Sequence, residues 1–526
     1  MSIQDKTKKH IHLPPGHTWR LPVLLAGLSF AALPLTAQAS PASVSKTDAP
    51  ITQALNTNTQ TGWVSVIFKT ASPLTSAQES QMSALGADIV RRLPIIGSVT
   101  VRVPAHNLAK LAALPFATHL SLDGKVQKTD AFTVGSSEAS QATVTTKYGW
   151  FSQTYQLTGA GVTVAVLDSG VTPVADLSSQ AGDIYNRSAS RVLANVNFST
   201  ALTKPTFNFF GALPLVSSSN NLSDPCGHGT HVAGIIAGNG SRSPAFYCTQ
   251  TCNGIAPQAN LVNVRVLDVN GESTVSTVIS GLQWVLNNQN RYKIRVVNLS
   301  LGHPVGESYT TDPICQAVEA LYNAGIVVVC AAGNDGRVNG DVNTPGFDNE
   351  GWGTAYGSVQ SPGNDPYIIT VGATKSMDGI RADDKIATYS SRGPSRLDLI
   401  MKPDIIAPGN KVISLDAHGS MLDTYGGGAN QVPYSYYVGP FATMALGLNG
   451  SSADYFQLSG TSMASPVVAG AAALLLQANP SLTPDTIKAR LMLSADKWFA
   501  ADGTEDPLTY GAGYLNIPAA LASTVV

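Results

Sequence analysis

Charged residues are scarce in this chain. Asp, Glu, Lys and Arg together make up 13% of its 526 residues, and the formal net charge is -2. Lys and Arg form no long block after the first 20 residues. Electrostatic binding to a nucleic acid needs a dense basic surface that neutralises several phosphates. The composition therefore argues against nucleic acid as a partner.

Long apolar runs are also few. The first, Leu21 to about Ala37, follows several basic residues and overlaps Ala37-Gln38-Ala39, a small-x-small pattern typical of signal-peptide cleavage. A retained membrane anchor is the alternative, but the run is short and has a proline near each end, Pro22 and Pro34. The second, Pro466–Ala478, has the length of a core helix. We expect residues 1–39 to be a signal peptide. The chain should be secreted to the periplasm or the medium, without stable membrane insertion after cleavage.

Cysteine is also scarce in this chain. The five cysteines are Cys226, Cys248, Cys252, Cys315 and Cys330, and no pair of their spacings forms a zinc site. Export permits disulfides, so we expect at least one. Cys248 could pair with Cys252, Cys315 with Cys330, or Cys226 with either of the first two, and the choice stays open. The odd number leaves at least one thiol free or paired with another chain.

What is present begins with a small domain. Residues 40–60 are rich in Ser, Thr, Gln and Asn and have the composition of a linker. Residues 61–127 show the order β-α-β-β-α-β, which is the ferredoxin-like motif of an α+β domain. We expect its strands at residues 63–68, 88–92, 98–103 and 118–122, and its helices at 76–85 and 105–114. Residues 123–147 lack hydrophobic periodicity and predict an exposed junction.

Residues 128–526 predict a larger domain of the α/β class. Strands that are apolar throughout alternate with helices, which indicates a mostly parallel sheet buried on both faces. We expect strands at residues 162–167, 261–266, 296–299, 326–330 and 367–371, and helices at 230–237, 275–287, 315–324 and 466–478. In such sheets, chemistry is expected in the loops at the carboxyl ends of the strands.

Two polar residues follow these strands. Asp168 comes directly after strand 162–167, where an isolated buried charge would be costly, so it must be hydrogen-bonded or paired. Its alternative role is to cap a turn. Asn334 follows strand 326–330 after a turn of small residues, and its amide can stabilise negative charge on a substrate oxygen. Its alternative is an ordinary turn residue.

Two further residues lie at helix starts. His228 opens an apolar helix, and His231 is three residues on, without the Glu and the four-residue spacing of zinc-protease helices. We therefore expect one catalytic and one structural histidine. Ser462 precedes the apolar run at 466–478, and at a helix start unpaired N–H groups favour negative charge. A helix cap is the alternative, but the small residues on both sides leave room for a substrate.

The chain order Asp168, His228, Asn334, Ser462 resembles that of the subtilisin-like serine proteases (the subtilase family, peptidase S8). The resemblance covers about Val162 to Asn516 and implies a subtilisin-like three-layer α/β/α fold. It implies that Ser462 attacks a peptide carbonyl, that His228 transfers the proton, that Asp168 orients His228, and that Asn334 binds the oxyanion. The matching segments are Asp168-Ser169-Gly170, Gly227–Gly234, Ala331–Asn334 and Gly460–Pro466.

The resemblance also implies a propeptide and two substrate edges. Residues 61–127 are similar in size, position and topology to the family's inhibitory propeptide, which assists folding and blocks the cleft until it is cut, here between about 123 and 147. Substrate should bind as an added strand between Ser300-Leu301-Gly302 and Gly271-Glu272-Ser273. Gln360 falls at the back of the primary specificity pocket, where a polar residue departs from the usual preference for large apolar side chains. Glu272 can favour basic residues a few positions upstream of the cut.

No cofactor is expected for catalysis. The metal ligands stay unassigned: the loop at residues 239–253, where many family members bind calcium, holds no Asp or Glu, and a structural calcium keeps a case only at Asp176. The expected partners are polypeptide substrates and the chain's own propeptide, and the chain should be a monomer. We predict a secreted serine endopeptidase made as a self-processing preproprotein. The alternatives are a silent homologue that only binds peptides and an acyl-transferring, macrocyclase-type relative.

Overall fold

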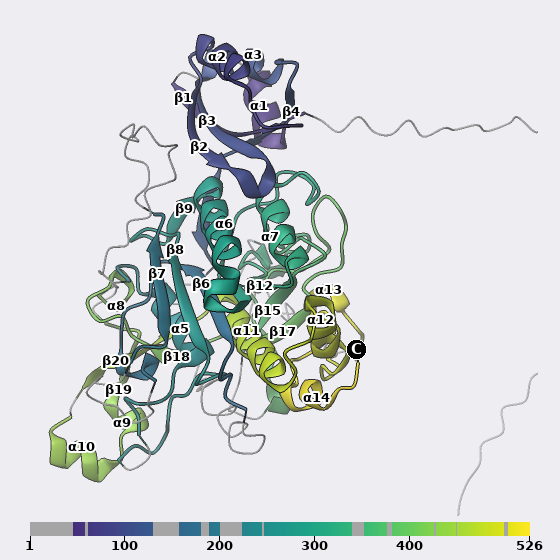
Figure 1. Cartoon of the computed structure of the whole chain (residues 1–526). Coiled ribbons are helices and arrows are strands. Elements are labelled where there is room, and N and C mark those ends of the chain that lie inside the picture. Colours follow the sequence, from purple (N-terminus) through teal and green to yellow (C-terminus); the bar gives the residue numbers. More distant parts are fainter. Residues whose placement is uncertain are drawn as a thin grey trace, which may run out of the picture. The chain divides into compact units, whose positions relative to one another are not determined.

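A computed structural model describes most of the chain beyond residue 45 (Figure 1). The described residues are 46–57, 62–129, 157–179, 189–199, 224–244, 247–338, 352–375, 381–424, 428–448, 450–498 and 503–525. The predicted signal peptide, residues 1–39, lies outside them.

The N-terminal domain, defined here as residues 62–122, is an antiparallel sheet with two helices beside it. Within the described residues its strands pair in the order β2-β3-β1-β4. Helix α2 begins at a capping box formed by Thr75 and Gln78.

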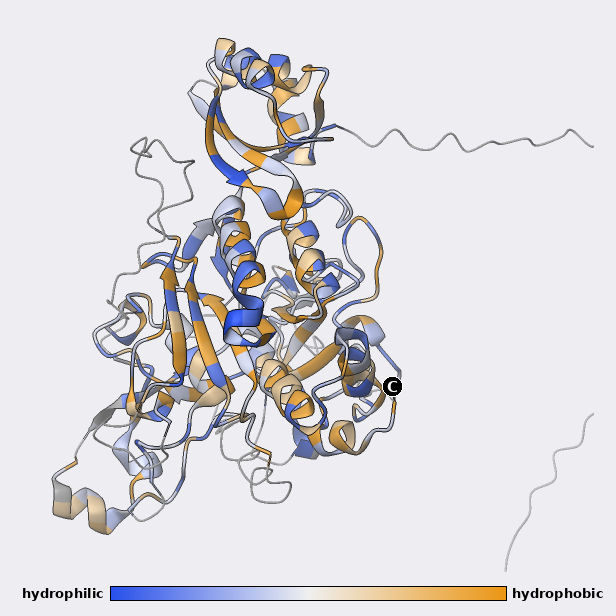
Figure 2. Ribbon diagram, viewed as in Figure 1, coloured by the Kyte–Doolittle hydropathy of each residue, from blue (hydrophilic) through white to orange (hydrophobic). Residues whose placement is uncertain are grey.

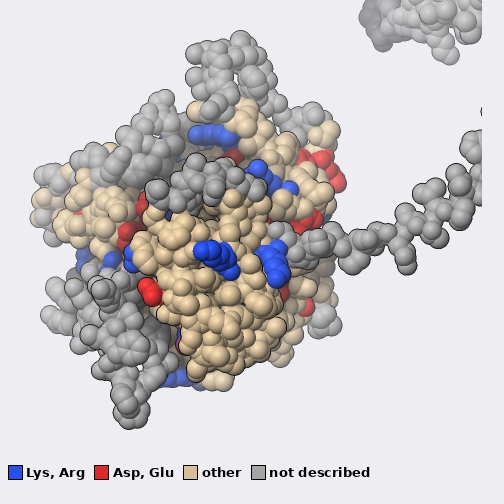
Figure 3. Space-filling view, turned by 90° about the horizontal axis from the view of Figure 1, so that it is seen from above, with Lys and Arg blue, Asp and Glu red and all other residues tan. Residues whose placement is uncertain are grey.

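The surface seen in Figure 3 carries separated Lys and Arg side chains among mostly uncharged residues. The elements are β1 (Trp63–Thr70), α2 (Ser76–Ala84), β2 (Asp88–Leu93), β3 (Ser98–Pro104), α3 (Leu108–Ala112) and β4 (Ala117–Leu122). The predicted ferredoxin-like succession is confirmed.

The segment before this domain differs from the prediction. Residues 40–60 were expected to be a linker, but α1 (Ala49–Thr57) forms within them. Asp48 accepts a hydrogen bond from the Ile51 N–H at 2.8 Å, which satisfies a donor at the helix start. Ile51 is buried in the core of the N-terminal domain. The segment is also tied to β4 by backbone bonds, Leu120 N–H to the Lys46 carbonyl oxygen at 2.8 Å and Asp48 N–H to the Leu120 carbonyl oxygen at 3.1 Å.

The larger domain is built on a mostly parallel sheet. Within the described residues the strand order is β16-β15-β12-β10-β6-β8-β7, with β17 also paired to β15. All of these pairs are parallel except β15 with β16. The strands are β6 (Thr163–Asp168), β7 (Val192–Asn197), β8 (Asn260–Arg265), β10 (Ile294–Leu299), β12 (Val327–Ala331), β15 (Ile369–Lys375), β16 (Lys385–Ile386) and β17 (Ile405–Pro408).

Helices cover both faces of this sheet (Figure 1). α5 (His228–Ala237) and α11 (Thr461–Ala478) pack on one face, and α6 (Val275–Tyr292) and α7 (Pro313–Asn323) pack on the other. Along β6, Val164 and Val166 face the first pair of helices, while Ala165 and Leu167 face the second. Both faces of the central strands β6, β12 and β15 are therefore buried, and much of the sheet is coloured as hydrophobic in Figure 2. The predicted three-layer α/β/α fold is confirmed.

Helix α11 is the one helix in the described residues that is long and apolar enough to cross a membrane. Inside the fold, 89% of it is buried. It is the central core helix that the run at 466–478 predicted, and it begins five residues earlier. The remaining elements of the larger domain are β13 (Arg337–Val338), β14 (Gly353–Thr354), β18 (Val412–Leu415), α8 (Met421–Thr424), β19 (Gln431–Pro433), α9 (Tyr434–Tyr437), α10 (Pro440–Leu446), β20 (Ser451–Leu458), α12 (Pro484–Leu493), α13 (Pro507–Tyr510) and α14 (Ile517–Ala522).

No disulfide joins the five cysteines, all of which lie in the described residues. The structure does not show the predicted disulfide. The candidate pair Cys315 and Cys330 occupies two separate packing sites, the first thiol 3.5 Å from Asn364 Oδ1 and the second 3.8 Å from the Leu301 carbonyl oxygen. Burial raises the pKa of Cys226 and of Cys330 to about 12, so these thiols stay protonated and unreactive.

Candidate active site

A buried Asp–His pair lies where β6 meets α5. Asp168 is the last residue of β6 and His228 is the first residue of α5. His228 Nδ1 lies 2.7 Å from Asp168 Oδ1, and both side chains are fully buried. The Ser169 N–H donates to the same Oδ1 at 2.7 Å. A carboxylate held in this way can fix the tautomer of the imidazole and stabilise a positive charge on it.

The approach of α5 to this turn requires glycine. A Cβ on Gly229 would lie 2.2 Å from the Gly170 carbonyl oxygen, so a side chain there would push the helix away from β6. Gly227, just before the helix, has a φ of +94°, a left-handed conformation that side chains disfavour. The glycines on either side of His228 therefore set its distance to Asp168.

Asp224 braces the same turn, and sequence reasoning missed it. Its Oδ1 accepts from Gly227 N–H and Ser169 Oγ, both at 2.8 Å. Its Oδ2 accepts from Thr230 N–H at 2.8 Å and from Thr230 Oγ1 at 2.9 Å. Burial raises the pKa of Asp224 despite these donors. The one sequence signal for this role was an Asp shortly before the start of a helix, where such residues often accept hydrogen bonds from the first backbone N–H groups.

Ser462 is the second residue of α11 and is fully buried. Its hydroxyl donates to the Ser300 carbonyl oxygen at 3.0 Å and lies 2.7 Å from Thr129 Oγ1. Its backbone N–H donates to the Thr129 carbonyl oxygen at 3.2 Å. The start of α11 therefore presents both a hydroxyl and a backbone donor to the same residue of another segment.

Asn334 is tied to the residue before Ser462. Its Oδ1 accepts from Thr461 N–H at 3.0 Å and from Thr461 Oγ1 at 3.1 Å. The Nδ2 group is buried and has no hydrogen-bond partner among the described residues. The amide is thus anchored through its oxygen and keeps its donors available, as a group that stabilises an oxyanion must.

The segment that reaches Ser462 is a strand of the predicted junction. β5 (Lys125–Lys128) lies between β9 (Glu272–Thr274) and β11 (Leu301–Gly302), antiparallel to both. Val126 is fully buried. The predicted junction is therefore a paired strand at residues 125–128, in which Lys125 and Gln127 are exposed as expected while Val126, and Thr129 just after the strand, are buried. Residues 130–147 lie outside the described residues.

The two predicted substrate edges are the strands that flank β5. The Thr129 N–H donates to the Ser300 carbonyl oxygen at 3.3 Å, and the Lys128 N–H donates to the Gly271 carbonyl oxygen at 2.9 Å. Gln127 pairs with Glu272 on one side and with Gly302 on the other. We call residues Lys125–Thr129 the cleft strand.

Gln360 and Glu272 lie on opposite sides of the cleft strand. Gln360 is buried and its Nε2 donates to Asp335 Oδ2 at 2.7 Å. A Cβ on Gly302 would lie 2.6 Å from Gln360 Oε1, and one on Gly333 would lie 2.8 Å from its Cγ. Gln360 therefore fills the space between β11 and the turn that carries Asn334. Glu272 Oε1 lies 2.5 Å from Lys125 Nζ in an exposed ion pair.

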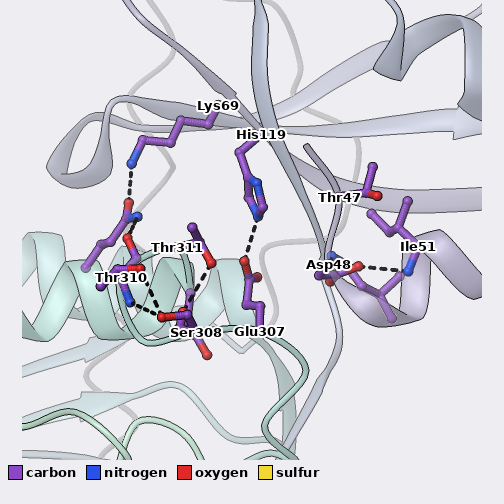
Figure 4. A network of polar contacts seen from close by, with 12 residues as sticks. Thr47, Asp48, Ile51, Lys69, His119, Glu307, Ser308, Thr310 and Thr311 are labelled. Atoms are coloured by element: carbon purple, nitrogen blue, oxygen red, sulfur yellow. Dashed lines mark hydrogen bonds and ion pairs between the residues drawn. The ribbon is translucent and has the colours of Figure 1, made fainter. Parts of the chain in front are cut away.

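A second contact region, which we call the docking face, lies away from Ser462. His119 Nε2 lies 2.6 Å from Glu307 Oε2, with the two side chains about nine-tenths buried. Lys69 Nζ donates to Gln316 Oε1 at 2.5 Å. Figure 4 shows Lys69 and His119 pointing from the N-terminal domain towards the segment of Glu307 to Thr311. The docking face consists of Lys69, His119, Glu307 and Gln316.

The predicted calcium ligand Asp176 is held by protein groups. Its Oδ1 accepts from the Tyr455 hydroxyl at 2.9 Å and its Oδ2 accepts from the Arg242 N–H at 3.0 Å. Burial raises the pKa of Asp176 to about 7. Because both oxygens already have donors, the geometry weakens the case for a cation at this residue.

Comparison with known proteins gives a consistent result. Residues 159–513 match the subtilase family, Peptidase_S8. The chain is similar to serine protease AprX of Bacillus subtilis strain 168, with 36% identity over 366 residues, 68% of this chain and 66% of AprX. It is similar to subtilisin DY of Bacillus licheniformis, with 32% identity over 310 residues, 59% of this chain and 83% of that protein. It is also similar to the extracellular serine proteinase of Thermus sp. strain Rt41A, with 30% identity over 403 residues, 76% of this chain and 70% of that protein.

A solved structure supports the fold. Fervidolysin from Fervidobacterium pennivorans, described as a keratinolytic enzyme related to subtilisin, matches with a TM-score of 0.58 and 20% identity over 89% of this chain. The match spans 62% of fervidolysin, as it spans 66% of AprX. The family match alone covers more than half of this sequence and includes the strand and helix ends that hold Asp168, His228, Asn334 and Ser462. The chain belongs to the subtilase family of serine proteases.

Proposed function

We propose that this chain is a secreted serine endopeptidase made as a self-processing precursor. The observation that carries the proposal is the Thr129 carbonyl oxygen, which accepts the Ser462 backbone N–H while Ser462 Oγ lies beside the same residue. A reacting peptide bond must lie against the nucleophile and an oxyanion donor in this way. Export is supported by the signal-like sequence of residues 1–39 and by the name of the extracellular Thermus relative.

In the proposed reaction, Ser462 Oγ attacks the carbonyl carbon and its proton passes to His228. Asp168, 2.7 Å from Nδ1, stabilises the imidazolium that forms. His228 then gives the proton to the leaving amine, and water releases the acyl group by the same exchange in reverse. The Ser462 hydroxyl must first turn from the Ser300 carbonyl oxygen to His228.

The negative charge that develops on the carbonyl oxygen has two proposed donors. One is the Ser462 backbone N–H, which already contacts the Thr129 carbonyl oxygen. The other is Asn334 Nδ2, which is buried and has no partner in the described part of the chain. Asn334 Nδ2 can therefore bond to the carbonyl oxygen of the substrate as negative charge develops on it. A bond that is stronger in the transition state than in the ground state lowers the activation free energy and does not merely bind the substrate.

The first bond to be cut is proposed to be Thr129–Asp130. The cleft strand lies between both substrate edges and ends with the Thr129 carbonyl at Ser462. This places the domain boundary two residues beyond the predicted residue 127. After the cut, the strand keeps its pairing with β9 and β11, so the N-terminal domain would remain bound as an inhibitor of the cleft.

The residues that line the cleft strand support a substrate preference. Gln360 occupies space next to Gly302 and Gly333, so a small side chain such as that of Thr129 should be preferred directly before the cut. Glu272 contacts Lys125, four residues upstream of Thr129, which supports a weaker preference for a basic residue there.

The test follows the full-length chain by intact-mass measurement. The wild type should release a product that begins at Asp130, and Ser462→Ala should stay uncut. Ser465→Ala is the matched control, since Ser465 is a buried serine on the same helix and should be processed normally. Equal maturation of wild type and Ser462→Ala would contradict the proposal. A different new terminus would contradict only the assigned bond.

A further inference from the structure

The segment between β18 and α8 carries a cluster of possible metal ligands outside the proposed active site. Asp416, His418 and Asp423 each offer one ligand atom, and these atoms lie within 4.8 Å of one another. Asp416 and Asp423 are 2% and 4% exposed, while His418 is exposed. The three ligand atoms, two carboxylate oxygens and one imidazole nitrogen, come from eight consecutive residues. They are close enough together to bind the same small ion.

The environment of Asp416 points to a ligand at this cluster. Both of its carboxylate oxygens are buried and accept no hydrogen bond from an N–H or hydroxyl donor in the described residues, and the polar contact of Asp416 is with the carboxyl group of Asp423. Asp423, by contrast, accepts from the Gly419 N–H at 2.7 Å and from Gln431 Nε2 at 2.5 Å. A buried carboxylate without donors is costly, so it needs a bound proton or a cation.

The surroundings of Asp416 add negative charge rather than donors. Burial, then the charge of Asp423 and a side-chain hydrogen bond with it, and last the charge of Asp454, raise the pKa of Asp416 to about 8. The backbone N–H of Asp416 is already used by the Asp454 carbonyl oxygen at 2.9 Å. His418 Nδ1 lies 3.2 Å from Asp423 Oδ2 and is the nearby group that can supply a nitrogen ligand.

We propose that Asp416, His418 and Asp423 bind one divalent transition-metal ion of the Zn²⁺ class. Zinc accepts carboxylate oxygen and imidazole nitrogen in a four-coordinate site, and water can complete the set. Calcium prefers six to eight oxygen ligands, and an imidazole is a poor ligand for it. This proposal is independent of the proposed proteolytic function.

The site would fasten the segment that precedes His228. The Met421 N–H donates to the Pro225 carbonyl oxygen at 2.9 Å, and the Leu422 N–H donates to the Cys226 carbonyl oxygen at 3.0 Å. A Cβ on Gly227 would lie 2.3 Å from Ser420 Oγ, so the two segments pack closely. An ion held between Asp416 and Asp423 therefore acts mainly on stability, by binding the folded chain in preference to the unfolded one.

The experiment measures zinc binding and thermal unfolding on the full-length Ser462→Ala chain, which cannot digest itself. We expect about one Zn²⁺ per chain by elemental analysis after dialysis, and a Tm raised by several degrees at saturating Zn²⁺. Asp416→Asn should lose both effects, and His418→Gln should weaken Zn²⁺ binding at least tenfold by calorimetry. His106→Gln changes an exposed histidine of the N-terminal domain and should bind zinc like the parent.

A metal-free measurement guards against a variant that merely misfolds. With chelator present and above pH 8, Asp416→Asn should be more stable than the parent, because it removes an uncompensated buried charge. The folded pKa of Asp416 is raised above the unfolded value of 3.8, so the parent loses stability as the pH rises from about 4 to about 8. The advantage of Asp416→Asn should therefore shrink as the pH falls through this range. Equal zinc uptake by all variants, no uptake by the parent, or Ca²⁺ binding that His418→Gln leaves unchanged would overturn the proposal.

Discussion

Residues 62–129 contact the larger domain through several regions, among them Arg91 on Thr277 and an apolar contact at Leu93 and Ile96. Two of these regions, the cleft strand and the docking face, differ in their chemistry. The cleft strand pairs through its backbone with β9 and β11, and any extended peptide can make the same bonds. The docking face contacts through side chains, with His119 on Glu307 and Lys69 on Gln316. In the proposed precursor, the first region therefore resembles a substrate, and the second distinguishes the chain's own domain from other peptides.

The two regions also differ in what cutting would change. A cut after Thr129 separates the reacting carbonyl from the rest of the chain but leaves the docking face intact. The cleft strand should therefore govern the rate of the cut, and the docking face should govern how long the N-terminal domain stays bound afterwards. Substitutions in the two regions should separate these two rates.

The largest effect is expected at Asn334, the proposed oxyanion donor. Asn334→Ala removes the Nδ2 donor and should lower turnover of an added peptide by about 10²–10³, with little change in KM, since the lost bond strengthens in the transition state. Self-cleavage after Thr129 should slow by a similar factor. Steady-state kinetics on material matured in trans would check this, and a change confined to KM would show that Asn334 only binds the ground state.

The next effect concerns the buried side chain of the cleft strand. Val126→Asp places a carboxylate in a fully buried position, which costs several kcal/mol and should slow self-cleavage by roughly a hundredfold. Val126→Leu, which keeps an apolar side chain, is the control and should mature within a few-fold of wild type. The measurement is the rate at which the precursor mass disappears. Normal maturation of Val126→Asp would mean that the strand is not held in the cleft during the cut.

A smaller and different effect is expected at the docking face. Glu307→Gln neutralises one partner of a pair that is about nine-tenths buried, and the N-terminal domain should leave roughly tenfold faster, which corresponds to about 1.4 kcal/mol. The cut itself should keep its rate. The lag between precursor cleavage and the appearance of activity on an added peptide measures the release. An unchanged lag with a slower cut would reverse the roles assigned to the two regions.

The sequence could predict the residues whose chemistry is local. Asp168 ends a strand that is apolar on both faces, and Ser462 lies in the first turn of the core helix α11, so strand and helix patterns alone located each of them at the end of an element. The β-α-β-β-α-β order of the N-terminal domain was readable for the same reason, because each of its strands buries residues at regular spacing.

The contacts that depend on distant backbone groups could not be predicted. The cleft strand is polar except for Val126, and its partners lie more than a hundred residues away along the chain. Asp224 acts through backbone donors of a tight turn, which leave no periodic signal. The disulfide stays a prediction, because export permits a disulfide but does not by itself bring two thiols into the same packing site.

The smallest effect should come from the exposed end of the cleft strand. Lys125 and Glu272 form an ion pair whose side chains are 56% and 43% exposed, and such pairs contribute up to about 1 kcal/mol. Lys125→Ala should slow self-cleavage by less than about fivefold at low salt. The difference should fade at high salt, because dissolved ions screen an exposed ion pair. The effect of a substitution at the buried Val126 comes from packing and should not depend on salt. Lys125→Arg keeps the charge and serves as the control. A salt-independent loss in Lys125→Ala would mean that the aliphatic stem of Lys125 packs in the cleft, which would make this residue similar in kind to Val126.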